Sequence, residues 1–250
     1  MPMNKIFPLP RRIEIAETES TNAYLRYLLT TEALPEGSVV VAAFQTAGRG
    51  QPGNYWESEA GKNLTFSMIL YPDRLPAAEQ FLLSQIVVLS VKQVLDRYTT
   101  DISVKWPNDV YWRDRKICGI LIENDLSGDS LSRSIVGIGL NLNQELFVSD
   151  APNPVSLKQI TCKEYTPDVL LEEYCSAFFA NYLCLLERKT ELIRSEYEKA
   201  LYRREGYFSY EDAGGIFEAR IHSIEPDGHL VLALPGGTLR RYAFKEVACR

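Results

Sequence analysis

Apolar residues along this chain recur either at the spacing of a helix or in the short runs typical of strands. Glycine or proline stands at most of the places where one pattern gives way to the other. Apolar residues at Leu83, Ile86, Val87 and Val91 recur at helical spacing, which predicts a helix over 77–98 with one buried stripe. Runs rich in β-branched residues predict buried strands instead. These strands cover 37–44, 63–71, 102–106, 117–123 and 134–140, after a short extended piece at 12–16.

Two further helices are predicted from the residues at their starts. Ser20, Thr21 and Asn22 precede a helix that ends near Leu29, and helix capping is the ordinary role of these three residue types. Pro167 is well placed at the first position of a long helical stretch. That stretch runs to about residue 201, with an interruption predicted near 189–190.

The chain changes character after the segment 201–206. Short alternating strands are predicted at 215–224, 229–234 and 238–244, with turns at Asp227-Gly228 and Gly236-Gly237. This change predicts two domains, 1–203 and 204–250. Consecutive strands with few crossovers favour an α+β fold over a doubly wound one. The expected sheet is mixed and mainly antiparallel, with helices on one face.

The composition narrows the function classes. A net charge of −6 argues against general nucleic-acid binding, for which a basic surface is expected. The five cysteines form no C-x-x-C pair and the two histidines lie late in the chain, which argues against a zinc site. No secretory signal is visible, and the longest apolar run, near 86–89, is too short to span a bilayer. These features predict a protein of the reducing cytoplasm without a membrane partner.

The stretch 104–122 places a polar segment between two apolar arms. Pro107 stops regular strand pairing, and Asn108-Asp109 favours a turn directly after it. A second tight turn is expected at 114–115, before a buried strand that follows Lys116. An amide, a carboxylate and an ammonium at one sheet edge would orient an anionic, hydrogen-bonding ligand. A surface hairpin with solvated charges is the alternative.

A glycine-rich segment at 45–56 is the second candidate site. Glycine lets the backbone approach a ligand, and Arg49 could bind a carboxylate or phosphate. The spacing matches neither a Walker motif nor a Rossmann fingerprint. A third candidate is the strand that contains Gly137 and Gly139, where a neighbour is expected to pack closely on the backbone. Each segment also fits a purely structural role, as a surface loop and as a strand packed against a helix.

Taken together, these segments resemble the biotin–protein ligases, of the kind without a DNA-binding domain. The resemblance covers about residues 12–145, and the end of the chain, from about 213, is similar to the family's small SH3-like barrel. The matching pieces occur in the family's order. They are Ser20-Thr21-Asn22, the loop 45–56, Gly61-Lys62-Asn63-Leu64, the stretch 105–119 with Lys-Trp-Pro-Asn-Asp, and the segment 137–141.

The resemblance implies a catalytic domain similar to class II aminoacyl-tRNA synthetases and a two-step reaction. Biotin and ATP would form biotinyl-5′-AMP and pyrophosphate, with Mg²⁺ bridged by the ATP phosphates and no protein-only metal site. Biotin would then pass to a lysine of a biotin carboxyl carrier domain. Lys116 and Arg49 are the implied catalytic cations.

The implied contacts fall into two sets. Biotin would be bound by Ser20, Thr21, Asn22, Gln45, Gly48, Arg49, Gly50, Lys116, Gly119 and Gly137. ATP and the adenylate would be bound by Arg49, Gln51, Trp56, Asn108, Asp109, Lys116 and Asn141. The glycines of the loop, Gly48, Gly50 and Gly53, would let it close over the adenylate and exclude water.

Two departures from the family pattern change what is expected. Gln51 stands where the family often has a second arginine, which leaves less positive charge over the adenylate. Few residues precede the first strand, so no winged helix and no operator binding are expected. The oligomeric state stays open, with a homodimer among the options.

Two other functions remain as alternatives. A lipoate or octanoate ligase or transferase would share the scaffold but carry a different glycine-rich signature. A biotin-binding module without enzymatic activity would have no use for the two cations, Arg49 and Lys116.

Overall fold

The computed structural model describes residues 11–51, 53–149 and 153–250. Pro52 of the glycine-rich loop and most of the N-terminal stretch inspected for a signal sequence lie outside the described residues. The chain divides into two compact units. The first unit consists of Met1–Ala77 and Asp114–Glu172, and the second of Ala78–Arg113 and Glu173–Arg250.

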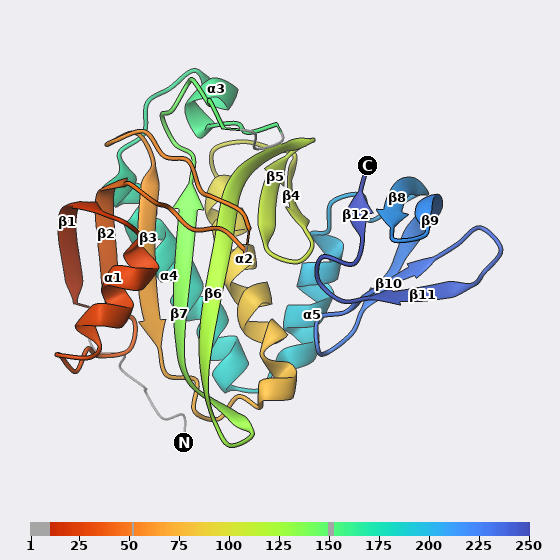
Figure 1. The fold of residues 1–250 in the computed structure, drawn as a ribbon, viewed down its shortest axis with the longest axis horizontal. Helices are drawn as coiled ribbons and strands as arrows, with labels where there is room; N and C mark the ends of the chain where they lie inside the picture. The colour runs from red at the N-terminus through yellow and green to blue at the C-terminus, as the bar shows by residue number, and fades with distance from the viewer. Residues whose placement is uncertain (1–10, 52, 150–152) are drawn as a thin grey trace. The chain divides into compact units, whose positions relative to one another are not determined.

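The first unit contains five neighbouring strands in the order β1-β2-β3-β7-β6 (Figure 1). β1 pairs in parallel with β2, and the other neighbours in this series are antiparallel. The strands are β1 (Arg12–Thr18), β2 (Val39–Gln45), β3 (Leu64–Leu70), β6 (Arg115–Ser127) and β7 (Ser130–Leu140). Helix α1 (Thr21–Leu28) contacts β2, β3 and β7, and a short helix, α3 (Leu157–Thr161), follows later in the chain.

The core of the first unit forms where apolar side chains of α1 meet the sheet. Leu25 and Leu28 of α1 join Val40, Ile69 and Ile135 in one buried cluster. All seven side chains of β3 are buried, so both faces of this strand are covered. The prediction of helices on one face only is therefore wrong at β3. Along β3, apolar Leu64, Phe66 and Met68 alternate with polar Thr65 and Ser67, and the two polar side chains are buried with hydrogen-bond partners.

The second unit contains helices, one hairpin and a separate sheet. The helical elements are η1 (Ala77–Glu79), α2 (Phe81–Leu95) and α5 (Thr190–Lys199), and α4 (Pro167–Leu186) runs into this unit from the first. Strands β4 (Ile102–Lys105) and β5 (Asp109–Trp112) form an antiparallel hairpin. The separate sheet has the order β11-β10-β9-β8-β12. Its strands are β8 (Phe208–Asp212), β9 (Gly215–Ile224), β10 (Leu230–Ala233), β11 (Leu239–Tyr242) and β12 (Ala248–Cys249).

The C-terminal sheet is attached to the β4–β5 hairpin within the second unit. Trp106 Nε1 donates a hydrogen bond to the Gly228 carbonyl over 2.8 Å, and the Trp106 and Phe244 rings meet edge to face at 6.1 Å. These contacts explain why Ala78–Arg113 groups with the C-terminal segment. The predicted domain boundary between residues 203 and 204 itself stays a prediction.

The predicted α+β class is confirmed, with a mixed, mainly antiparallel sheet and a small antiparallel sheet at the C-terminus. The predicted interruption near 189–190 is the gap between α4 and α5. The short elements α3, β5, β8 and β12 were not predicted from the sequence. No apolar run of bilayer length was expected, whereas Ala77–Leu95 and Pro167–Leu186 reach that length and hydropathy as helices. Much of the first of these is buried inside the protein, as in a core helix.

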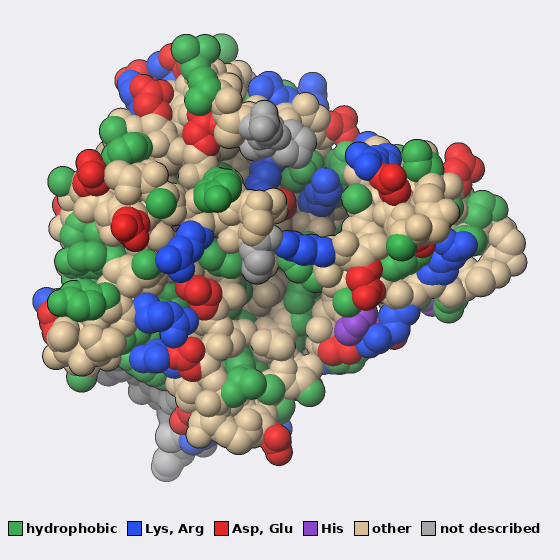
Figure 2. All heavy atoms as spheres, viewed as in Figure 1, with side chains coloured by type: hydrophobic (Ala, Val, Ile, Leu, Met, Phe, Trp, Pro, Cys, Tyr) green, Lys and Arg blue, Asp and Glu red, His purple; other side chains and the backbone are tan. Residues whose placement is uncertain are grey.

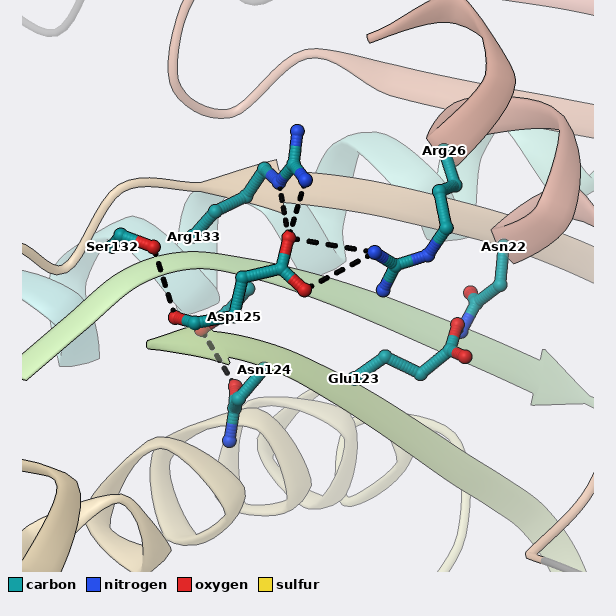
Figure 3. Close-up of polar contacts among 8 residues, drawn as sticks. Asn22, Arg26, Glu123, Asn124, Asp125, Ser132 and Arg133 are labelled. Atoms are coloured by element: carbon teal, nitrogen blue, oxygen red, sulfur yellow. Dashed lines mark hydrogen bonds and ion pairs between the residues drawn. The ribbon is translucent and has the colours of Figure 1, made fainter. Parts of the chain in front are cut away.

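An ion-pair network ties α1 to the β6–β7 hairpin. Asp125 of β6 pairs with Arg26 of α1 over 3.1 Å and accepts a hydrogen bond from Arg133 Nε of β7 over 2.6 Å (Figure 3). Partial burial raises the pKa of the Asp125 carboxyl, but the two arginines outweigh it and hold that pKa below its usual 3.8. The ionised carboxylate therefore stabilises the folded unit.

We expect Asp125→Asn to lower the free energy of unfolding by about 1 kcal/mol at pH 7, because the three side chains are partly solvated. The carboxylate's contribution is present above the unfolded-state pKa near 3.8 and is lost as the pH falls through the lower folded-state pKa. Urea denaturation of both proteins should thus give curves that converge on acidification. Asp129→Asn, at the exposed turn of the same hairpin, is the matched control. A gap between wild type and Asp125→Asn that is independent of pH would contradict the assignment.

Candidate functional site

The start of α1 buries three polar residues without using them as helix caps. Ser20 occupies the N-cap position in extended conformation, and its side chain makes no capping hydrogen bond. Ser20, Thr21 and Asn22 are nevertheless almost fully buried. Buried polar groups need partners, so the side chains of Thr21 and Asn22 are bound elsewhere.

Those partners form a hydrogen-bonded series that we call the polar chain: Gln45, Thr21, Ser67, Asn22 and Glu123. Gln45 Oε1 accepts the backbone N–H of Thr21 over 2.8 Å. The Ser67 hydroxyl lies 2.7 Å from Thr21 Oγ1 and 2.6 Å from Asn22 Oδ1. Asn22 Nδ2 donates to Glu123 Oε2 over 2.9 Å, and Figure 3 shows these two side chains pointing toward each other from α1 and β6. The polar chain thus connects α1 with β2, β3 and β6.

Ser67 and Glu123 were not among the predicted site residues. A serine inside the apolar run 63–71 was a signal that could have drawn attention to Ser67, because a buried hydroxyl needs a hydrogen-bond partner. Glu123 sits at the end of a predicted strand, and its sequence context gives no comparable indication.

The glycine-rich loop is a small hairpin closed by its own backbone. Arg49 bridges Tyr55, Gly50 N donates to the Asn54 carbonyl over 3.0 Å, and Trp56 N donates to the Gly48 carbonyl over 2.9 Å. A Cβ atom on Gly48 would lie 2.4 Å from the Trp56 carbonyl oxygen, so only glycine fits there. Arg49 is exposed, and Gln51 is half-buried with its carbonyl accepting from Asn54 N.

The indole of Trp56 lies directly on the backbone of β6 and β7. A Cβ atom on Gly139 would lie 2.3 Å from Trp56 Cε2, and one on Gly119 would lie 3.0 Å from Trp56 Cζ3. The same Gly119 position lies 3.2 Å from Cε of Lys116. The loop that carries Arg49 and the strand that carries Lys116 therefore meet at Trp56. Gly139 lies on the strand where a close neighbour was predicted, and that neighbour is Trp56, but Gly139 is not among the residues predicted to contact a ligand.

Two buried polar atoms in this region have no hydrogen-bond partner among the described residues: Trp56 Nε1 and Asn141 Oδ1. Asn141 is held by its other side-chain atom, since Nδ2 donates to the Val155 carbonyl over 3.1 Å. The backbone of Lys116 is held nearby, with its carbonyl accepting from Val155 N over 2.9 Å. One buried donor and one buried acceptor thus lack a hydrogen-bond partner among the described residues.

The neighbour of Trp56 in sequence, Glu57, anchors the loop to the segment after β7. Its carboxylate accepts from Ser149 N over 2.8 Å, Val148 N over 2.9 Å and Gln144 Nε2 over 3.0 Å. Partial burial raises the pKa of the Glu57 carboxyl, but these donors outweigh it and bring that pKa below 4.5. Glu57 therefore stays ionised at neutral pH and fixes the base of the loop.

The other predicted residues are distributed over both units. The space beside Gly137 is taken by Asn22, because a Cβ there would lie 2.3 Å from Asn22 Oδ1. Asn108 and Asp109 belong to the second unit, at the turn of the β4–β5 hairpin, and Asn108 is buried. The assignment of individual residues to biotin or to the adenylate, including Gly119 and Gly137, stays a prediction.

We expect Gly139→Ala to lower the free energy of unfolding by about 1–3 kcal/mol, because the new methyl group would collide with the Trp56 indole. In a Trp56→Ala background the same change should cost little, so a double-mutant cycle by urea denaturation would show strong coupling. Gly236→Ala is the control, since a Cβ at that position meets no atom within 4 Å. Additive effects of the Gly139 and Trp56 substitutions would refute the contact.

Known proteins resemble this chain in sequence and in fold. The chain is 38% identical over 125 residues to the bifunctional ligase/repressor BirA of Escherichia coli, a match that covers 50% of this chain and 38% of BirA. It is 31% identical over 170 residues to the biotin–[acetyl-CoA-carboxylase] ligase of Paracoccus denitrificans, covering 66% of this chain and 70% of that protein. The chain thus spans less than half the length of BirA but most of the shorter ligase.

The fold is similar to that of the biotin protein ligase from Aquifex aeolicus solved in complex with biotin and ATP. That comparison has a TM-score of 0.80 at 26% identity and covers 97% of this chain and 99% of the other. It bears out the predicted ligase-like catalytic sheet and small C-terminal domain. The model of the biotin/lipoate A/B protein ligase family matches residues 14–141, just over half of the sequence. These 128 residues hold the polar chain, the glycine-rich loop, Lys116 and Asn141, and the chain belongs to the biotin/lipoate A/B protein ligase family.

Proposed function

We propose that this protein is an ATP-dependent biotin–protein ligase. One observation carries the proposal: Trp56 packs on Gly119 and Gly139 beside Lys116, which joins the arginine-bearing loop to the lysine-bearing strand. A site that activates a carboxylate with ATP must bring two anions together, the carboxylate and the phosphates of ATP. Such a site needs cations beside both of them. Relatives named as biotin ligases support the choice of biotin.

The polar chain is suited to the ureido end of biotin. A ureido group has one carbonyl acceptor and two N–H donors, so its recognition requires both donors and acceptors. Thr21, Gln45 and Ser20 provide hydroxyl and amide groups at the start of α1 and the end of β2. We assign biotin contacts to these residues together with Asn22, Gly48, Gly50, Gly119 and Gly137.

ATP is the second substrate in this proposal. Trp56 Nε1 and Asn141 Oδ1 are a buried donor and a buried acceptor that lack protein partners among the described residues, and a nucleotide offers groups for both. Gln51, Asn108 and Asp109 complete the proposed adenylate contacts. The loop would close on the adenylate from its anchored base and shield it from water.

The proposed reaction has two steps. An oxygen of the biotin carboxylate attacks the α-phosphorus of ATP, the bond to the β-phosphate breaks, and pyrophosphate leaves. The amine of an acceptor lysine then attacks the acyl carbon, loses a proton and releases AMP. Lys116 and Arg49 would stabilise the negative charge that develops on the α-phosphate in the first step.

Mg²⁺ bound by the ATP phosphates would neutralise part of their charge. Among the described residues, potential metal ligands gather only at Glu225, Asp227 and His229 of the C-terminal sheet. Arg241 already pairs there with Glu225 and with Asp227, so this cluster is a poor metal site.

The acceptor in this proposal is a biotin carboxyl carrier domain, and the reaction would take place in the cytoplasm. We also propose that the protein does not act on an operator. Figure 2 supports this, because Lys and Arg side chains are interspersed with acidic ones over the face of the first unit shown, and the net charge is −6. A homodimer is compatible with these assignments. Lipoate or octanoate transfer is the alternative, since the family model covers both substrates.

The proposal predicts pyrophosphate release that depends on biotin. Purified protein with ATP and Mg²⁺ should release pyrophosphate when biotin is added and not when lipoate or octanoate is added. Release with lipoate alone would favour the alternative ligase. Release with none of the three would leave a binding module as the better description and would defeat the proposal.

Lys116→Ala should slow adenylate formation by about 100-fold to 1000-fold while changing biotin affinity much less, because the ammonium acts on charge that develops in the transition state. Single-turnover pyrophosphate release and titration of biotin binding measure the two quantities separately. Lys163→Ala, an exposed lysine of the same unit, is the matched control. A normal rate in Lys116→Ala would remove this residue from the mechanism.

A further inference from the structure

The polar chain has a direction that is set at its far end by Glu123. An ionised carboxylate accepts hydrogen bonds and donates none, so the group of Asn22 that faces Glu123 must be the NH₂. The bond of 2.9 Å from Asn22 Nδ2 to Glu123 Oε2 has this arrangement. The opposite side of the same amide, Oδ1, is therefore an acceptor and faces Ser67.

The number of hydroxyl protons fixes the direction of the next two hydrogen bonds, at Ser67 and Thr21. A serine hydroxyl has a single proton, and Asn22 Oδ1 has none, so Ser67 donates to Asn22 over 2.6 Å. The contact of 2.7 Å between Ser67 Oγ and Thr21 Oγ1 is then a hydrogen bond only if Thr21 is its donor. This distance is typical of an O–H···O bond, whereas the alternative from Thr21 Oγ1 to Gln45 Oε1 is 3.1 Å.

The direction of the hydrogen bonds is therefore fixed at Thr21, the end of the polar chain nearest the proposed biotin site. With its proton directed to Ser67, the Thr21 hydroxyl offers lone pairs, so it accepts a hydrogen bond from a ligand. Gln45 Oε1 faces Thr21 and accepts its N–H, so the opposite side of the same amide presents Nε2, a donor. One acceptor beside one donor matches the N–H and C=O of a ureido group.

The hydrogen-bond direction would be reversed if the amide of Asn22 flipped. Close packing around Asn22 leaves little room for any other rearrangement. Asn22 is 2% exposed, and a Cβ on Gly137 would lie 2.3 Å from its Oδ1, so β7 confines the side chain. A flip exchanges oxygen and nitrogen with little change of shape. It would direct the amide oxygen at the Glu123 carboxylate, which repels it, and at the Leu121 carbonyl, to which Nδ2 also donates over 3.4 Å. Glu123 is charged and lies closer to Nδ2, at 2.9 Å, so it opposes the flip more strongly than the Leu121 carbonyl does.

We propose that Glu123 is a positioning residue that determines specificity for the ureido group by fixing Thr21 as an acceptor through Asn22 and Ser67. This inference rests on the proposed function, because it assumes biotin as the ligand. Glu123 contacts Asn22 rather than the ligand. It therefore acts on the substrate only by setting which groups of the polar chain donate and which accept.

The test is the steady-state kinetics of Glu123→Gln, which has nearly the same shape as the native residue but can both donate and accept. Both directions of the polar chain then become available. We expect the KM for biotin to rise about 10-fold, with kcat and the KM for ATP within about two-fold of wild type. Desthiobiotin, which keeps the ureido group and lacks the sulfur-containing ring, should show the same rise in KM.

Ser67→Ala provides a second variant that interrupts the polar chain without touching Glu123, and it should give the same rise in KM for biotin. Asp125→Asn is the control on the same strand, since it removes a carboxylate that pairs with Arg26 and Arg133 and makes no contact with the polar chain. Its KM for biotin should equal that of wild type. Urea denaturation verifies that each variant is folded under the assay conditions.

The outcomes separate this inference from the proposed function. If wild-type protein releases pyrophosphate with biotin and both Glu123→Gln and Ser67→Ala keep its KM for biotin, the positioning role is wrong and the ligase function stands. Equal losses in kcat and in both KM values would indicate a merely structural role for Glu123. If wild-type protein is inactive with biotin, the proposed function fails first.

Discussion

The close approach of the Trp56 indole to the backbone of β6 and β7 is the contact on which the rest of the site depends. The indole can lie there only because Gly119 and Gly139 carry no side chain. Its position brings the glycine-rich loop onto the sheet, and Glu57 then anchors the base of that loop by accepting hydrogen bonds from three donor groups. A side chain at Gly139 would push the indole away and separate Arg49 from the strand of Lys116.

The class of fold and most of its strands and helices could be predicted from the sequence because they depend on local order. Proline and glycine mark the turns, and apolar spacing separates helices from strands. The role of Ser20, Thr21 and Asn22 could not be predicted in the same way. Their residue types suit capping, but the structure buries Thr21 and Asn22 against Ser67 and Glu123, which lie tens of residues away in the sequence.

The partners of Thr21 and Asn22 could not be predicted because they depend on the register of the strands. Successive side chains of a strand point to opposite faces, so a shift of one residue would move Ser67 to the other face of β3. The observed register pairs Ser67 with Gly137 and Leu121 with Gly137 on either side, which places Ser67, Gly137 and the start of α1 together. Long-range register of this kind is set by packing of the whole unit. A single sequence indicates the strands but not which of their residues become neighbours.

The polar chain is also an unusual element to find within an apolar core. Buried polar groups that are fully hydrogen-bonded contribute little net stability, and apolar residues of similar size often stabilise a core as well or better. Ser67 and Asn22 are almost completely buried, so each would be costly if one partner were lost. Stability alone therefore gives little reason for this arrangement. A directed series of hydrogen bonds is useful where one end must present a defined donor or acceptor to a ligand, and the end at Thr21 lies in the segment assigned to biotin.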